Sequence, residues 1–247
     1  MRKYRRALGG AAGLVVVGLA ATIGTANAAV ITSDTVTIWN AATPGSTSTS
    51  ISQQGLPTAV GLFGGPLLLV AASTPFTSPI NYSEITGTDT IPGFFTFDTP
   101  HAPTPTTCTS TACLTNPLTL GGFAQATVFR FTFTETTAET LSVTHDDGVS
   151  LFVAGTETGL TPSTCNNTGA GCPGDLFPTS VALPTTAVTN SVTIGPGTYD
   201  LWYAQVNGLP AVLQATSTPL VPEPASLMLL GSALVGLGFV GRRRKAV

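Results

Sequence analysis

The residues best suited to chemistry form one short run, His145-Asp146-Asp147-Gly148. Its two adjacent carboxylates are hard oxygen ligands, and a Ca²⁺ ion takes roughly six to eight of these. Asp175 or Asp200, together with backbone carbonyls, would complete such a shell. Asp146 and Asp147 are therefore a candidate calcium site. The same run also fits a plain turn, because glycine tolerates positive φ and aspartate hydrogen-bonds its own backbone. Both interpretations stay open on the sequence alone.

No catalytic residue is predicted. His145 is one of only two histidines, and the other, His101, lies in a loop rich in proline and threonine, so neither a zinc site nor a histidine-based catalytic pair is indicated. The chain has no Gly-x-Ser-x-Gly elbow and no P-loop. Between the two ends of the chain there is no lysine, which removes amine chemistry. The protein is expected not to be an enzyme.

The four cysteines form two local pairs, Cys108 with Cys113 and Cys165 with Cys172. In an exported chain, such pairs favour disulfides over metal-binding thiols. Three connectivities exist, and proximity favours pairing within each loop. The chain-entropy model assigns each small ring about 2 kcal/mol of stabilisation.

The elements that position these residues are predicted to be short β-strands, because apolar and polar residues alternate along them. In 128–134, Phe129, Phe131 and Phe133 share one face. The pattern predicts an all-β, antiparallel β-sandwich over 29–220, with an antiparallel meander from 123 onward and a hairpin over 191–206. Further strands are expected at 31–39, 94–97, 149–153 and 211–215, with two short strands around a turn in 59–70. The predicted inward residues are Phe129, Phe131, Phe133, Leu141, Val143, Leu151, Val153, Leu201 and Tyr203.

Two runs resemble one known family. Residues 145–155, His-Asp-Asp-Gly-Val-Ser-Leu-Phe-Val-Ala-Gly, are similar to the Asp-Asp-Gly strand pair of the protective-antigen-type β-sandwich of toxins, glycosidases and fungal flocculins. Residues 197–203 with Gly208 resemble its closing strands. The resemblance covers about 123–215 and implies that Asp146 and Asp147 hold a calcium ion that helps to bind sugar hydroxyls. Ala154-Gly155 stands where that family has Asp or Asn before Gly.

Charge separates the two ends of the chain from its middle. Eight of the nine lysines and arginines lie in the first six and last six residues, and Arg130 is the ninth. All twelve acidic residues lie between Asp34 and Glu223, which gives residues 29–241 a formal charge of −11. Nucleic acid and anionic lipid are therefore poor partners for the middle part.

The N-terminal end predicts export. A basic start, an apolar stretch over 8–23 and the small residues of Ala26-Asn27-Ala28 are typical of a secretory signal peptide over 1–28. At the other end, the apolar run 225–240 is followed by Arg242, Arg243, Arg244 and Lys245. As a helix it would span about 24 Å, short of the roughly 30 Å of a bilayer core, so it predicts a marginal membrane anchor. Both basic clusters are expected on the cytoplasmic side.

Pro222-Glu223-Pro224, the apolar run and the arginine cluster together, at 221–247, resemble the PEP-CTERM sorting tail of Gram-negative bacteria. The resemblance implies processing by an exosortase in the inner membrane and delivery to the cell surface or its polysaccharide matrix. The leading hypothesis is an exported surface or matrix protein with a non-catalytic binding module, for which calcium-dependent glycan binding is the candidate activity. A purely structural protein is the alternative, and an exported hydrolase ranks third.

Overall fold

The architecture comes from a computed structural model of the chain. It describes residues 28–41, 67–84, 89–96, 111–118, 127–158, 160, 172–177, 186–206, 208–220, 231 and 233. The predicted signal peptide, the loops that carry Cys108 and Cys165, and the sorting tail from 221 onward lie outside these residues, apart from Ala28, Gly231 and Ala233.

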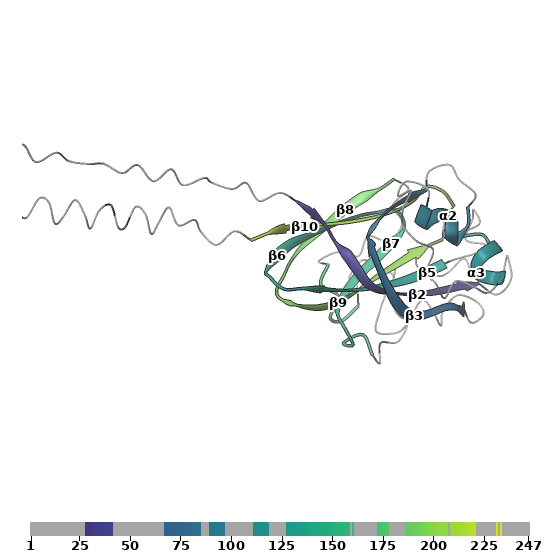
Figure 1. Ribbon diagram of the computed structural model, residues 1–247, viewed down its shortest axis with the longest axis horizontal. Coiled ribbons are helices and arrows are strands. Elements are labelled where there is room, and N and C mark those ends of the chain that lie inside the picture. The colour runs from purple at the N-terminus through teal and green to yellow at the C-terminus, as the bar shows by residue number, and fades with distance from the viewer. Residues whose placement is uncertain are drawn as a thin grey trace, which may run out of the picture.

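The described residues form a sandwich of two five-stranded sheets in which every strand pair is antiparallel (Figure 1). The strands are β1 (Ala29–Val30), β2 (Thr32–Ala41), β3 (Leu67–Pro79), β4 (Asn81–Glu84), β5 (Thr127–Glu135), β6 (Glu139–His145), β7 (Gly148–Val153), β8 (Val188–Ile194), β9 (Gly197–Gln205) and β10 (Ala211–Pro219). Two short helices accompany them, α2 (Ile91–Thr96) and α3 (Thr111–Thr115). The predicted all-β sandwich is confirmed.

The first sheet has the order β1-β10-β6-β8, with β4 also paired to β10, and the second sheet has the order β3-β2-β5-β9-β7. From β4 onward, consecutive strands therefore alternate between the two sheets. The predicted meander is wrong, and so is the predicted hairpin over 191–206, because β8 pairs with β6 while β9 pairs with β5 and β7. Each tight turn in this half carries the chain across the sandwich instead of back along the same sheet.

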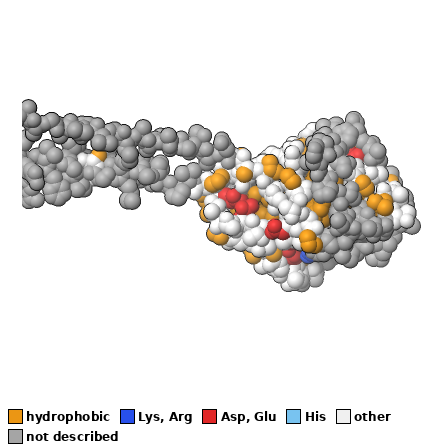
Figure 2. All heavy atoms as spheres, in the orientation of Figure 1, with side chains coloured by type: hydrophobic (Ala, Val, Ile, Leu, Met, Phe, Trp, Pro, Cys, Tyr) orange, Lys and Arg blue, Asp and Glu red, His pale blue; other side chains and the backbone are white. Residues whose placement is uncertain are grey.

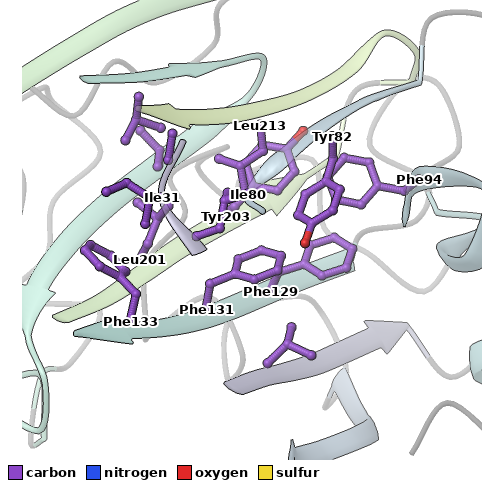
Figure 3. Close-up of a cluster of buried hydrophobic side chains, with 14 of the residues drawn as sticks. Ile31, Ile80, Tyr82, Phe94, Phe129, Phe131, Phe133, Leu201, Tyr203 and Leu213 are labelled. Carbon is purple, nitrogen blue, oxygen red and sulfur yellow. The ribbon is translucent and has the colours of Figure 1, made fainter. Parts of the chain in front are cut away.

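An aromatic cluster fills the space between the sheets (Figure 3). Phe129, Phe131 and Phe133 of β5 are fully buried, as their alternation predicts. Their rings meet others from both sheets: Phe131 stacks on Tyr82 of β4 at 5.6 Å between centroids, and Phe129 stacks on Tyr203 of β9 at 6.0 Å. Burial of each such side chain contributes about 2–3 kcal/mol, so this cluster is the main source of stability.

Helix α2 corrects the strand expected at 94–97. Thr90 caps it, because its hydroxyl accepts a hydrogen bond from the Gly93 amide at 3.2 Å and its carbonyl accepts one from the Phe94 amide at 3.0 Å. Threonine is a favoured N-cap, and the proline that follows Ile91 suits a first helical turn. The helix inserts Phe94 and Phe95, both fully buried, into the aromatic cluster.

Two further expectations differ from the structure. Residues 67–70, expected in one of two short strands, begin the 13-residue strand β3, which pairs with β2 through several register shifts. Val153, expected to point inward, is 45 % exposed because it ends β7 beyond the core. Its neighbour Phe152, on the opposite face of β7, is fully buried beneath the segment 172–177, where a Cβ on Gly174 would lie 3.9 Å from its ring.

Candidate functional site

The Asp-Asp-Gly turn, residues 146–148, joins β6 of the first sheet to β7 of the second. It is therefore not a hairpin turn, which is how its sequence is usually interpreted. Asp147 has a φ of 65°, in the left-handed region that aspartate tolerates better than most residues. The Asp147 amide donates to Asp146 Oδ1 at 2.9 Å, and the Asp146 amide donates to the Val212 carbonyl of β10 at 3.0 Å.

The Asp147 carboxylate connects this turn to the end of β9. Its Oδ2 accepts a hydrogen bond from the Val206 amide at 2.8 Å. Nearby, the Tyr203 hydroxyl donates to Gln205, whose side-chain amide donates to the Gly208 carbonyl at 2.5 Å. Burial, followed by the charges of the two aspartates, raises the pKa of Tyr203 well above its usual value. Buried polar contacts thus hold the Asp-Asp-Gly turn against the connection between β9 and β10.

His145 is fully buried at the end of β6. Its Nδ1 lies 2.6 Å from the Asp147 carbonyl oxygen, which can only accept, so Nδ1 carries the proton and donates. Nε2 then accepts from the Asn190 side-chain amide at 3.2 Å. Burial lowers the pKa of His145 to about 4, although the bond to Asp147 opposes this shift. The ring is neutral at pH 7 and holds the backbone of the turn in place.

The same contacts bear on the candidate calcium site. One oxygen of Asp146 and one of Asp147 already accept backbone amide hydrogens. Asp175 accepts hydrogen bonds from the Leu151 and Phe177 amides at 3.1 Å each. Asp200 accepts one from the Thr132 hydroxyl. None of these bonds connects Asp175 or Asp200 to the Asp-Asp-Gly turn. Within the described part of the chain, no three acidic, histidine or cysteine side chains converge on one point. The described donor set does not fit a calcium shell, and the geometry favours the turn interpretation.

The cysteines are described only in part. Cys113, in α3, and Cys172 are both buried, and neither is a free thiol. Their expected partners, Cys108 and Cys165, lie outside the described residues. The two local pairings therefore stay a prediction.

The structure also brings together aromatic and charged residues that sequence analysis did not predict to be in contact. Trp39 of β2, Arg130 of β5 and Trp202 of β9 meet on the outer face of the second sheet, with Glu157 and Asp200 beside them. The alternation of β5 and β9 does place Arg130 and Trp202 on the outer face. A tryptophan that points away from the core was the one sequence signal that could have indicated a site there. Their contact depends on strand order, which the sequence pattern does not reveal.

The described fold and its buried turn define an antiparallel β-sandwich module within residues 28–220. A known motif follows β10 in the chain. A family model described as the PEP-CTERM protein-sorting motif matches residues 220–245, which include Pro222, Glu223, Pro224 and the arginine cluster Arg242 to Arg244. The chain therefore carries a PEP-CTERM sorting motif, which indicates bacterial export, exosortase processing and sorting to the surface.

No curated protein and no solved structure matches the chain significantly. The resemblance of 123–215 to the protective-antigen-type sandwich remains a prediction. Among the described residues, no helix has the length and hydropathy needed to cross a membrane.

Proposed function

We propose that the protein is an exported surface or matrix protein of a Gram-negative bacterium. Its tail holds it briefly in the inner membrane until an exosortase-type enzyme cleaves near Pro222-Glu223-Pro224. Its sandwich is a non-catalytic module that binds polysaccharide. The match of residues 220–245 to the sorting motif is the observation that carries the proposal. The charge distribution supports it, because the basic residues flank the module and would stay in the cytoplasm.

The sorting part of the proposal is tested by deleting Pro222 to Pro224 while the apolar run is kept. The altered protein should stay in the inner-membrane fraction, since the anchor remains and the recognition sequence is gone. Ser226→Ala, a conservative change in the same tail, is the matched control and should be released normally. Fractionation with immunoblotting measures the distribution, and mass spectrometry of the released protein locates its new C-terminus. Normal release of the deletion variant would contradict exosortase recognition.

A purely structural role is the second candidate, and one feature of the first sheet favours it. The outer face of this sheet carries rows of hydroxyls that hydrogen-bond across strands, Ser142 with Ser191 at 2.9 Å and Thr144 with Thr189 at 2.7 Å. Such a face is uncharged and already partly satisfied, which suits a spacer. Binding of purified protein to polysaccharide separates the two candidates, because a spacer would bind none.

A further inference from the structure

The outer face of the second sheet brings together both tryptophans of the chain and the only lysine or arginine among the described residues. Strand β5 lies between β2 and β9, and Arg130 is paired in register with Thr37 on one side and Trp202 on the other. Trp39 and Trp202 stack with their ring centroids 5.2 Å apart and their planes 14° from parallel. The Arg130 guanidinium carbon lies 5.8 and 5.6 Å from the two centroids. We call these three residues the indole–guanidinium cluster.

Two carboxyl groups border the indole–guanidinium cluster. The turn after β7 places Glu157 Oε1 4.0 Å from Arg130 Nη1. Burial raises the pKa of Glu157, and hydrogen bonding and the charge of Asp200 raise it further. The charge of Arg130 acts in the opposite direction, because it stabilises the ionised form of Glu157.

Two buried N–H groups at the cluster have no hydrogen-bond partner among the described residues: Trp202 Nε1 and Arg130 Nε. Trp202 is 4 % exposed. Buried polar atoms nearly always have a partner, so atoms left without one point to a bound molecule or water. The cluster is also open to solvent, since the Arg130 side chain is 28 % exposed and Trp39 is half-buried. Figure 2 shows basic atoms at the surface of the module, next to acidic ones.

The chemistry of these atoms narrows the class of ligand. An acidic ligand would be repelled by the −11 charge of residues 29–241. A cation would meet Arg130, which already occupies the space beside both rings. A purely apolar ligand would leave the two buried N–H donors unsatisfied. A neutral sugar has a C–H face that packs on an aromatic ring, and its hydroxyls can accept hydrogen bonds from the two N–H groups.

We propose that the indole–guanidinium cluster is a binding site for a neutral saccharide. This inference rests on the proposed polysaccharide-binding function and assigns it a place. It lies on the outer face of the second sheet, whereas the Asp-Asp-Gly turn joins β6 of the first sheet to β7 of the second. Binding here requires no metal ion.

The test uses the purified full-length protein in a detergent without a sugar headgroup, probed with an array of neutral and acidic oligosaccharides. Because both tryptophans lie in the cluster, saccharide binding should change the intrinsic fluorescence of the unaltered protein, with or without a chelator. Trp202→Phe keeps an aromatic ring but removes the N–H, so we expect the affinity for the saccharide to fall about fivefold. Trp39→Ala removes a stacking face, so we expect the affinity to fall at least about tenfold. Ser142→Ala, on the outer face of the first sheet, is the control and should leave affinity unchanged.

The outcomes separate this inference from the proposed function. Binding of a saccharide with unchanged affinity in both tryptophan variants would overturn the site and leave polysaccharide binding intact. Binding of acidic oligosaccharides alone would overturn the ligand class. Absence of any binding would overturn both and favour the spacer. Circular dichroism checks that each variant folds, and if Trp39→Ala does not, Trp202→Phe and the fluorescence titration still decide.

Discussion

The buried His145 should make the stability of this protein depend on pH in a way that one substitution removes. Its pKa is lowered to about 4 in the folded protein from an ordinary value of 6.5. In the unfolded chain the ring binds a proton below pH 6.5, whereas the folded protein resists protonation until about pH 4. The free energy of unfolding therefore falls as pH drops through this window and levels off below it. The loss from this group is about 2 kcal/mol between pH 7 and 5, and about 3 kcal/mol by pH 4.

Other groups change stability over the same range. Burial raises the pKa of Asp175 to about 6 and that of Glu135 to about 7, so both favour the folded state as pH falls and oppose His145. The informative quantity is therefore a difference. His145→Gln does not titrate, and the remaining groups are shared by the two proteins. Urea denaturation at pH 7, 6 and 5 should show the advantage of the unaltered protein over the variant shrinking by about 2 kcal/mol.

Two results would refute this reasoning. One is a difference in unfolding free energy that stays constant from pH 7 to 5. The other is an NMR titration in which the His145 ring protonates near pH 6.5. Either would mean that the ring is hydrated in the folded protein and does not hold the Asp147 carbonyl as described.

The remaining predictions concern the turn, the core and the cysteines. Asp147→Asn should be nearly neutral in urea denaturation, because asparagine tolerates the left-handed backbone and still offers an oxygen to the Val206 amide, whereas Asp147→Ala should lose about 2–4 kcal/mol. Equal losses would show that the backbone, not the hydrogen bond, limits this site. Phe131→Ala should cost about 3–5 kcal/mol by the same assay, and a loss below 1 kcal/mol would contradict its place in the core. Millimolar calcium should leave the melting temperature unchanged, since the described donors do not fit the ion, and a clear rise would restore the calcium site. Reduction should destabilise the protein by about 2 kcal/mol for each small ring if Cys113 and Cys172 pair within their loops, and peptide mapping would identify the pairs.

The sequence predicted which way side chains point much better than which strands are neighbours. Alternation places Phe129, Phe131 and Phe133 on one face because successive residues of a strand face opposite sides. That period is the same in a hairpin and in a turn that crosses between sheets. The Asp-Asp-Gly run therefore predicted a turn correctly and its partners wrongly.

The sequence signal for the short helix α2 was present but weak. The helix at 91–96 depends on the Thr90 cap and is only six residues long, too short to show a helical period. The neighbourhood of Trp39 and Trp202 depends on β5 lying between their strands, a contact across more than half of the chain. Sequence patterns that report on nearby residues cannot supply such contacts.

The pairing of β10 determines how the module would respond to mechanical load. Its last residue, Pro219, directly precedes the matched sorting motif, and residues 213–219 are paired continuously with β6, while β1 and β4 hold its other edge. A force directed along β10 shears these ladders, so their hydrogen bonds share the load and must fail together. A strand pulled sideways from a sheet edge would lose them one at a time. A module held through its C-terminal end would therefore be loaded along a strand that is difficult to peel away.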